Sequence, residues 1–214
     1  MFKRITSLLI VTLAASLSAC QSAYYSAAEK VGYDKREILV DRVEDSRDAQ
    51  SEAGEQFQSA LEQLSALTQF DGGDLEDMYD AMESEYEDSV AAAENVSERI
   101  DAVDDVAQAL FDEWQEEIQQ YSSTRLKADS QSKLRETQRR YDGMIKAMRR
   151  SEAKMDPVLA ALKDNVMYLK HNLNARAVAS LKVEFQSIED DIEALIAEMQ
   201  KAIASSDAFI ESMK

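Results

Sequence analysis

Residues 79–121 read YDAMESEYEDSVAAAENVSERIDAVDDVAQALFDEWQEEIQQY, and apolar side chains recur in this stretch at alternating intervals of three and four residues. The series is Tyr79, Met82, Tyr86, Ser89, Ala93, Val96, Ile100, Val103, Ala107, Leu110, Trp114, Glu117 and Tyr121. Only Ser89 and Glu117 are plainly polar. Such a repeat over about six heptads is typical of a long helix with a single apolar seam.

The same period predicts three more long helices on either side of this one. The expected ranges are 28–70, 74–121, 124–172 and 175–213. Their seams are Leu39, Val43, Ser46, Gln50, Ala53, Phe57, Ala60, Leu64 and Leu67 in the first; Leu134, Gln138, Tyr141, Ile145, Met148, Glu152, Met155, Leu159, Leu162, Val166, Leu169 and Leu173 in the third; and Val178, Leu181, Phe185, Ile188, Ile192, Leu195, Met199, Ala202, Ser206 and Ile210 in the fourth.

Turn signals separate these segments. Gly72 and Gly73 end the first helix, and Asp74 can cap the next. The acidic residues here suggest a calcium loop, but the glycines come too early for an EF-hand. At 172–174, Asn172 can take a left-handed cap and Asn174 an N-cap, whereas YSST at 121–124 is a weaker break. The seam keeps its phase through Pro157, which predicts one helix kinked near residues 152–157.

The chain therefore reads as an all-α protein. Only five Gly and one Pro occur in 214 residues, too few turn residues for a β-rich fold. Matched helices with short connections predict an elongated antiparallel four-helix bundle, or coiled coil of long helices, about 70 Å long. The alternative is a three-helix rod that runs straight through 121–124 and dimerises through its uncovered seam, which would make the chain a homo-oligomer.

The amino-terminal stretch has the layout of an export signal. Residues 1–19 combine Lys3 and Arg4 with a short apolar run, too short to span a bilayer, and then small residues. Leu17-Ser18-Ala19-Cys20 resembles the bacterial lipobox, in which the cysteine thiol receives diacylglycerol. Cys20 is the only cysteine, so no internal disulfide can form. The expected organisation is a signal peptide at 1–19, a lipidated tether at 20–27 and one helical domain at 28–214.

Lipid attachment at Cys20 would place the protein on a membrane of the cell envelope. Resemblance to enterobacterial lipoproteins implies the outer membrane, facing the periplasm, because Gln21 rather than Asp follows the cysteine. The expected partners are the membrane, through the N-terminal lipid, and an unidentified envelope protein.

Charge is unevenly distributed along the chain. The formal net charge is −18, and nucleic acid would be repelled by it. Residues 74–120 hold seventeen acids and one base, whereas 125–154 hold ten bases and four acids. We expect the basic stretch mainly to pair with the acidic helix across the turn at 121–124. The alternative is a surface patch for anionic lipid or another polyanion.

The sequence offers no catalytic constellation. A di-iron bundle needs Glu-x-x-His motifs, but His171 is the only histidine and Tyr168 stands three residues before it. No Gly-rich phosphate loop occurs, and one histidine supports no triad. We expect no enzyme activity, cofactor or metal, and His171 is expected to lie at a helix end.

The export signal, the stretch YYSAAEKVGYDKREILVDRVEDSRDAQ at 24–50 and the acidic helical body together resemble an uncharacterised family of proteobacterial envelope proteins, a domain of unknown function. The resemblance implies fold and compartment but no activity. The expected function is a non-enzymatic, lipid-anchored scaffold, spacer or protein-interaction module. The alternative is a periplasmic carrier for an apolar or anionic ligand.

Overall fold

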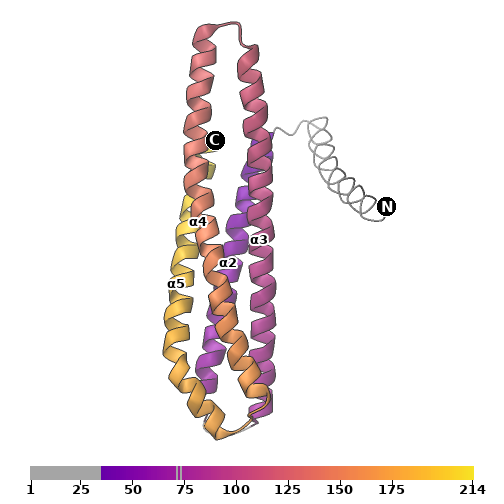
Figure 1. The fold of residues 1–214 in the computed structure, drawn as a ribbon, viewed down its shortest axis with the longest axis vertical. Helices are drawn as coiled ribbons and strands as arrows, with labels where there is room; N and C mark the ends of the chain where they lie inside the picture. Colours follow the sequence, from indigo (N-terminus) through magenta and orange to yellow (C-terminus); the bar gives the residue numbers. More distant parts are fainter. Residues whose placement is uncertain (1–34, 71, 73) are drawn as a thin grey trace, which may run out of the picture.

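Four α-helices run up and down the long axis of the molecule (Figure 1). The computed structural model describes residues 35–70, 72 and 74–214. The helices are α2 (Lys35–Thr68), α3 (Leu75–Gln120), α4 (Thr124–Lys170) and α5 (Ala175–Met213). The predicted all-α antiparallel bundle is confirmed, and the turn between α3 and α4 rules out the three-helix rod.

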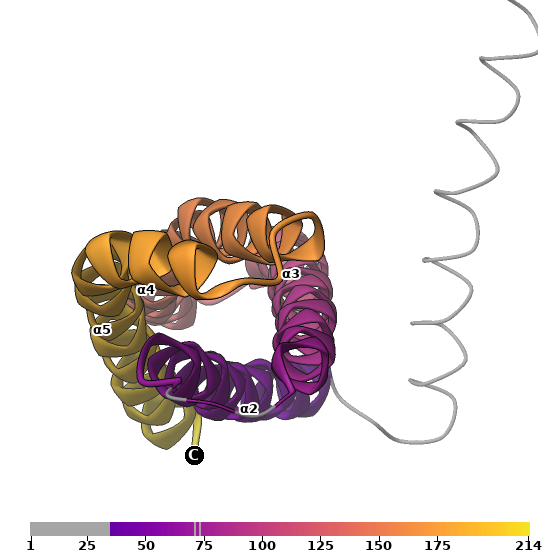
Figure 2. The ribbon, with the colours of Figure 1, turned by 90° about the horizontal axis from the view of Figure 1, so that it is seen from below.

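The helices form a four-sided bundle around a central core. Helix α2 packs against α3 and α5, and α4 packs against the same two helices from the other side (Figure 2). Each seam faces the axis because positions three and four apart share one face of a helix. Large side chains that are fully buried there include Phe57, Leu64, Met82, Ile100, Met148, Leu162 and Phe209.

Helices α3 and α4 extend past the other two at one end. They have 46 and 47 residues, against 34 in α2 and 39 in α5. Helix α2 begins beside Glu113, which pairs with Lys35 at 2.8 Å, and Arg36 donates to the carbonyl oxygen of Met213. Beyond this level the α3–α4 hairpin continues without α2 or α5 (Figure 1). We call residues 114–140 the tip, and the end with the other two turns the distal end.

Side-chain caps fix most helix starts where the sequence predicts them. The Asp74 carboxylate accepts from the N–H of Glu76 at 2.9 Å, and Ser123 caps α4. The Asn174 side chain accepts from the N–H groups of Arg176 and Ala177, which confirms the hairpin at 172–174. Gly72 has φ +148°, a backbone conformation that side-chain-bearing residues rarely adopt.

Asn172 differs from its prediction. Among the described residues only glycine has positive φ, so Asn172 is not the left-handed cap expected from the sequence. Its backbone N–H and its side-chain amide instead donate to the carbonyl oxygens of Leu169 and Tyr168, at 2.8 and 2.9 Å. The side-chain amide and the backbone N–H of Asn172 together satisfy two of the last carbonyls of α4, so no left-handed residue is needed.

Helix α4 runs unbroken through Pro157, as the phase of its seam predicts. Proline removes the hydrogen bond to the carbonyl of Ala153. Both Ala153 and Pro157 are exposed, so water can reach that carbonyl. The orange half of α4 leans toward α3 in Figure 1.

The predicted seams fail near the helix ends. Tyr121 and Leu173 are exposed by 45% and 42%, and Glu117 is also exposed while its neighbour Ile118 is buried. Tyr121 and Leu173 lie in turns rather than helices, where the seam no longer faces the core. The helices also end up to two residues earlier than predicted, and residues 28–34 of the first predicted helix lie outside the described residues.

Candidate functional site

The predicted lipid-attachment residue, Cys20, lies outside the described residues, as do the signal peptide at 1–19 and the tether at 20–27. Within the described residues, three features stand out from the apolar bundle. They are a buried polar layer near its middle, a charged bridge at the edge of that layer, and the two ends of the rod.

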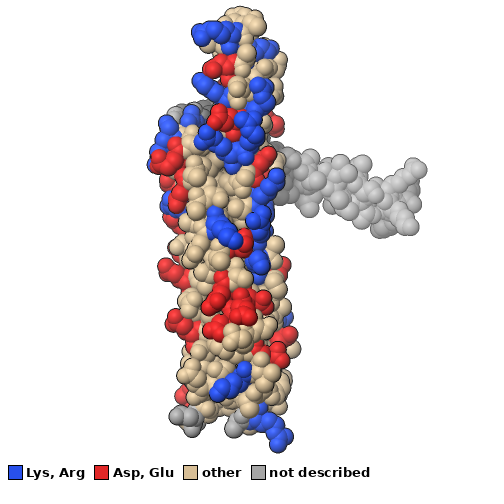
Figure 3. All heavy atoms as spheres, turned by 90° about the vertical axis from the view of Figure 1, so that its left-hand side faces the viewer, with Lys and Arg blue, Asp and Glu red and all other residues tan. Residues whose placement is uncertain are grey.

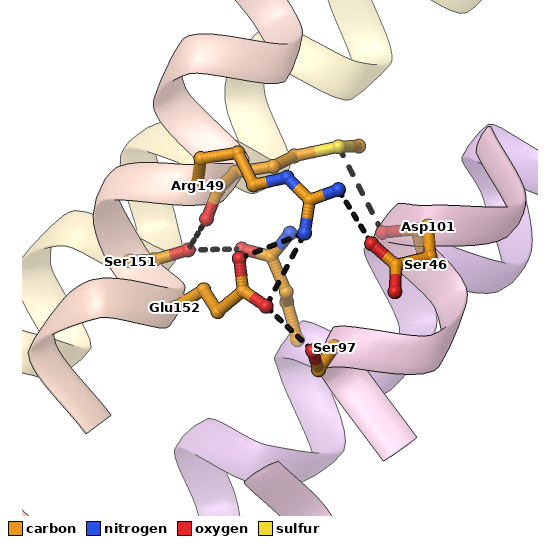
Figure 4. Close-up of polar contacts among 8 residues, drawn as sticks. Ser46, Ser97, Asp101, Arg149, Ser151 and Glu152 are labelled. Carbon is orange, nitrogen blue, oxygen red and sulfur yellow. Dashed lines mark hydrogen bonds and ion pairs between the residues drawn. The ribbon is translucent and has the colours of Figure 1, made fainter. Parts of the chain in front are cut away.

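The polar layer consists of Ser46 and Gln50 of α2 and Ser151 of α4, all with no exposed surface (Figure 4). The Ser151 hydroxyl has acceptors in Gln50 Oε1 at 3.0 Å and the Met148 carbonyl at 2.7 Å. Ser46 lies with its oxygen 3.8 Å from the sulfur of Met148. The side-chain nitrogen of Gln50 has no hydrogen-bond partner among the described residues. Burying that donor unpaired lowers the stability of the fold.

These contacts give the polar layer no evident catalytic chemistry. A serine becomes a nucleophile when a base takes its proton. The groups that accept from Ser46 and Ser151 are a thioether, an amide oxygen and a backbone carbonyl, none of which is a base at neutral pH. The layer therefore pairs α2 with α4 across the core at one height, which is how a buried polar residue fixes the register of a helical bundle.

A charged bridge joins α3 to α4 at the same height (Figure 4). Arg149 donates to Asp101 at 2.5 Å and to Glu152 at 3.0 Å, and Glu152 accepts from Ser97 at 2.6 Å. Burial of the guanidinium lowers the pKa of Arg149, but its hydrogen bonds to the Asp101 and Glu152 carboxylates outweigh that effect, so the pKa is raised. Glu152, which the sequence places in the apolar seam, therefore lies at the edge of the core and accepts hydrogen bonds from Arg149 and Ser97.

A buried tyrosine makes a second polar contact between these helices. The hydroxyl of Tyr141 donates to Asp104 at 2.5 Å, and its ring packs edge-on against Phe111 and Phe209. Burial and the Asp104 carboxylate both raise the pKa of the Tyr141 phenol above its usual value near 10. Tyr141 therefore stays protonated over the physiological range.

The remaining chemistry-bearing residues do not converge. His171 caps the C-terminal end of α4 and is exposed, as predicted. Within residues 35–70, 72 and 74–214, no group of three His, Cys, Asp or Glu side chains is placed to hold a metal ion. No helix in the part of the chain that the structure describes is both long and apolar enough to cross a membrane.

The expected pairing of the basic stretch 125–154 with the acidic helix is wrong for most of its residues. Of its ten bases, only Arg149 forms an ion pair with α3. Lys133 and Arg140 pair with acids of α4 itself, and Arg150 pairs with Glu198 of α5. Six bases form no ion pair with any described residue: Arg125, Lys127, Arg135, Arg139, Lys146 and Lys154.

The pairing fails because of where the side chains point. Heptad spacing aims the seam of α4 at the bundle axis, which turns Arg125, Arg135 and Arg139 toward solvent. Lys and Arg consequently gather over the upper part of the rod, with acidic side chains across its middle (Figure 3). The tip holds six bases and four acids, against fifteen and thirty-five in the other described residues. The tip thus has a net charge of +2 in an acidic described chain.

Exposed apolar side chains are also confined to the ends. Among the described residues, the exposed large hydrophobic side chains are Tyr121 and Leu126 at the apex of the tip, and Met167, Tyr168, Leu173 and Val183 at the distal end. Val183 is the most exposed of them, at 77%. Sequence periodicity alone could not single these residues out, because Tyr121 and Leu173 continue a buried seam in the sequence.

The described residues thus define an elongated antiparallel four-helix bundle whose charged sides carry apolar residues only at the two ends. The chain belongs to the family described as "Protein of unknown function (DUF2959)", whose model matches residues 24–213. No curated protein matches the chain. The predicted membership of a family of unknown function is confirmed.

Proposed function

We propose that this protein is a non-enzymatic, lipid-anchored helical spacer of the bacterial cell envelope that presents its distal end to a protein partner. The observation that carries the proposal is the confinement of exposed apolar side chains to the two ends of a rod with charged sides. Where exposed apolar side chains gather into a patch they mark an interaction site, whereas charged side chains keep the sides of the rod hydrated.

The N-terminal sequence that precedes the helical bundle supports the lipid anchor. A lipobox-like Leu17-Ser18-Ala19-Cys20 follows a short apolar segment, and a thiol is the nucleophile that forms a thioether with diacylglycerol. Two or three acyl chains hold a protein durably on a bilayer, whereas a single chain holds it only marginally. Gln21 after Cys20 favours the outer membrane, with the bundle in the periplasm.

The rod sets how far the distal end stands from its attachment. Helix α2 has 34 residues and begins at the level of Glu113, so the α2–α3 turn lies about 50 Å further along the axis. Buried core residues from all four helices pack together along this span. The distal end, with Met167, Leu173 and Val183, is the surface that a partner held away from the anchor would meet.

The anchor is tested by replacing Cys20 with Ser and measuring the mass and detergent partitioning of the mature protein. Wild type should begin at Cys20, carry acyl chains and enter the detergent phase, whereas Cys20→Ser should do none of these. The control Cys20→Ser/Ser26→Cys keeps one thiol but moves it outside the lipobox-like motif, and it should behave like Cys20→Ser. Unchanged processing and partitioning of Cys20→Ser would refute the anchor.

The partner is tested by photo-cross-linking in intact cells. A cross-linking amino acid at Val183, at the distal end of α5, should give a discrete adduct with another protein. The same amino acid at Glu193, exposed ten residues further along α5, is the matched control and should give none. Equal labelling from both positions, or an adduct only from Glu193, would remove the distal end as the docking surface.

A further inference from the structure

We propose that the tip is a membrane-facing surface that binds the headgroups of anionic phospholipids. The inference rests on the proposed lipid anchor at Cys20 for its orientation. It rests on the described residues of α3 and α4 for its chemistry. It assigns a role to the basic stretch that ion pairing with α3 leaves unexplained.

The described part of the chain begins beside the tip. Cys20 is fifteen residues before Lys35, so the intervening chain can reach at most about 50 Å when fully extended. Lys35 lies beside Glu113 on α3, only seven residues before that helix ends at Gln120. The tip therefore rises about 10 Å beyond the point where the chain joins the bundle. The end of the rod nearest the attachment of the anchor is the end that carries the tip.

The two ends of the rod differ in net charge. The tip has a net charge of +2, and Arg125, Lys127, Arg135 and Arg139 form no ion pair with any described residue. At the distal end, residues 69–88 hold nine acids and no base, and residues 161–183 hold four bases and one acid, which together give a net charge of −6. An anionic bilayer attracts basic residues within about a Debye length of its surface and repels acidic ones. The tether permits many orientations, and this asymmetry favours the one with the tip toward the bilayer.

The apex of the tip combines exposed apolar side chains with basic ones. Tyr121 and Leu126 are each exposed by 45% and flank the turn, with Arg125 and Lys127 beside Leu126. Tyrosine and leucine next to basic residues suit the boundary between headgroups and acyl chains, where a ring or apolar side chain can enter while the charges stay among phosphates. A hairpin apex can insert these two side chains without disturbing the core.

The test uses the full lipidated protein reconstituted into vesicles. Once Cys20 is bound to lipid, an introduced cysteine is the only free thiol in the chain. A fluorescent donor is attached at Ser122→Cys, in the tip, or at His171→Cys, in the distal turn about 70 Å away along α4. Energy transfer to a headgroup-labelled lipid then reports which end lies near the bilayer.

With phosphatidylglycerol-containing vesicles, we expect strong transfer from the tip donor and weak transfer from the distal donor. Neutral phosphatidylcholine vesicles, or high salt, should reduce the difference. Replacing Arg125 and Lys127, the two bases beside the apex, together with Gln should lower the ratio of docked to undocked tips by up to about 30-fold. The control variant changes Lys163, Arg176 and Lys182, three exposed bases near the distal end, to Gln. It should behave like wild type.

Equal transfer from both donors, or a tip signal that ignores lipid charge and the tip substitutions, would overturn the proposal. Light scattering tests the competing explanation that the tip of one chain binds the acidic distal end of another. An increase in particle size that requires the tip bases but no lipid would overturn membrane binding in favour of this self-association. Absence of acyl chains on Cys20 would refute the anchor separately. The tip would then be judged by cosedimentation of the same chain with vesicles, where equal binding to phosphatidylglycerol and phosphatidylcholine overturns it.

Discussion

Replacing Gln50 with Leu should stabilise the bundle. Gln50 has no exposed surface, and its side-chain nitrogen has no hydrogen-bond partner among the described residues. An unpaired buried donor costs about 1–3 kcal/mol. The substitution keeps the approximate volume of the side chain, so it removes this cost without opening a cavity.

The substitution also removes one favourable contact. Ser151 donates to Gln50 Oε1 at 3.0 Å, and a hydrogen bond of this kind contributes about 0.5–1.5 kcal/mol. Ser151 is not left unpaired, because the Met148 carbonyl accepts from it at 2.7 Å. The balance is a gain of about 1 kcal/mol in the free energy of unfolding, or about 2–4 °C in the melting temperature of a chain of this size.

The assay is thermal and urea unfolding of wild type, Gln50→Leu and Gln58→Leu followed by circular dichroism. Gln58 is exposed on the same helix, so its substitution should change stability by no more than about 0.5 kcal/mol. A lower melting temperature for Gln50→Leu, with Gln58→Leu unchanged, would refute the reasoning. It would mean that the polar layer specifies the fold by more than one unpaired amide.

Two further predictions concern single polar contacts. Because burial and the Asp104 hydrogen bond raise the pKa of Tyr141 above the unfolded value near 10, its contribution to stability is complete below pH 10 and is lost as the pH rises further. The loss amounts to up to about 1.4 kcal/mol per pH unit. Tyr141→Phe should flatten this decline in urea titrations between pH 9 and 11, and an unchanged slope would contradict it. Asn174→Ala should lower the unfolding free energy by about 1 kcal/mol because it removes the α5 cap, whereas Asn174→Ser should retain most of it, and equal losses would contradict the capping role.

Sequence periodicity predicts the helices well because a seam is a local property. The alternation of three and four is set by the pitch of one helix, so it survives at Ser89, whose buried hydroxyl donates to the Glu85 carbonyl within the same turn. It also carries through Pro157. It fails at Tyr121 and Leu173, because a seam read along the chain does not show where the neighbouring helices stop.

Ion pairing between helices, in contrast, could not be predicted from the sequence. Their totals along the chain predict that a helix with seventeen acids and a segment with ten bases should pair when laid side by side. Pairing depends on side-chain direction, and of the bases of α4 only Arg149 and Lys170 form ion pairs with acids of α3. Composition gives the net charge of each segment, but it does not show on which side of the helix the charged side chains lie.

What the sequence alone determined is the all-α class, the four helices, the caps at Asp74 and Asn174, and the family resemblance, because each depends on residues close together in the chain. Only the tertiary structure decided that Ser46, Gln50 and Ser151 form one layer and that α3 and α4 extend as a basic tip. These features depend on the axial offset between helices that are distant in sequence. That offset is set by how four seams pack together, and no single segment encodes it.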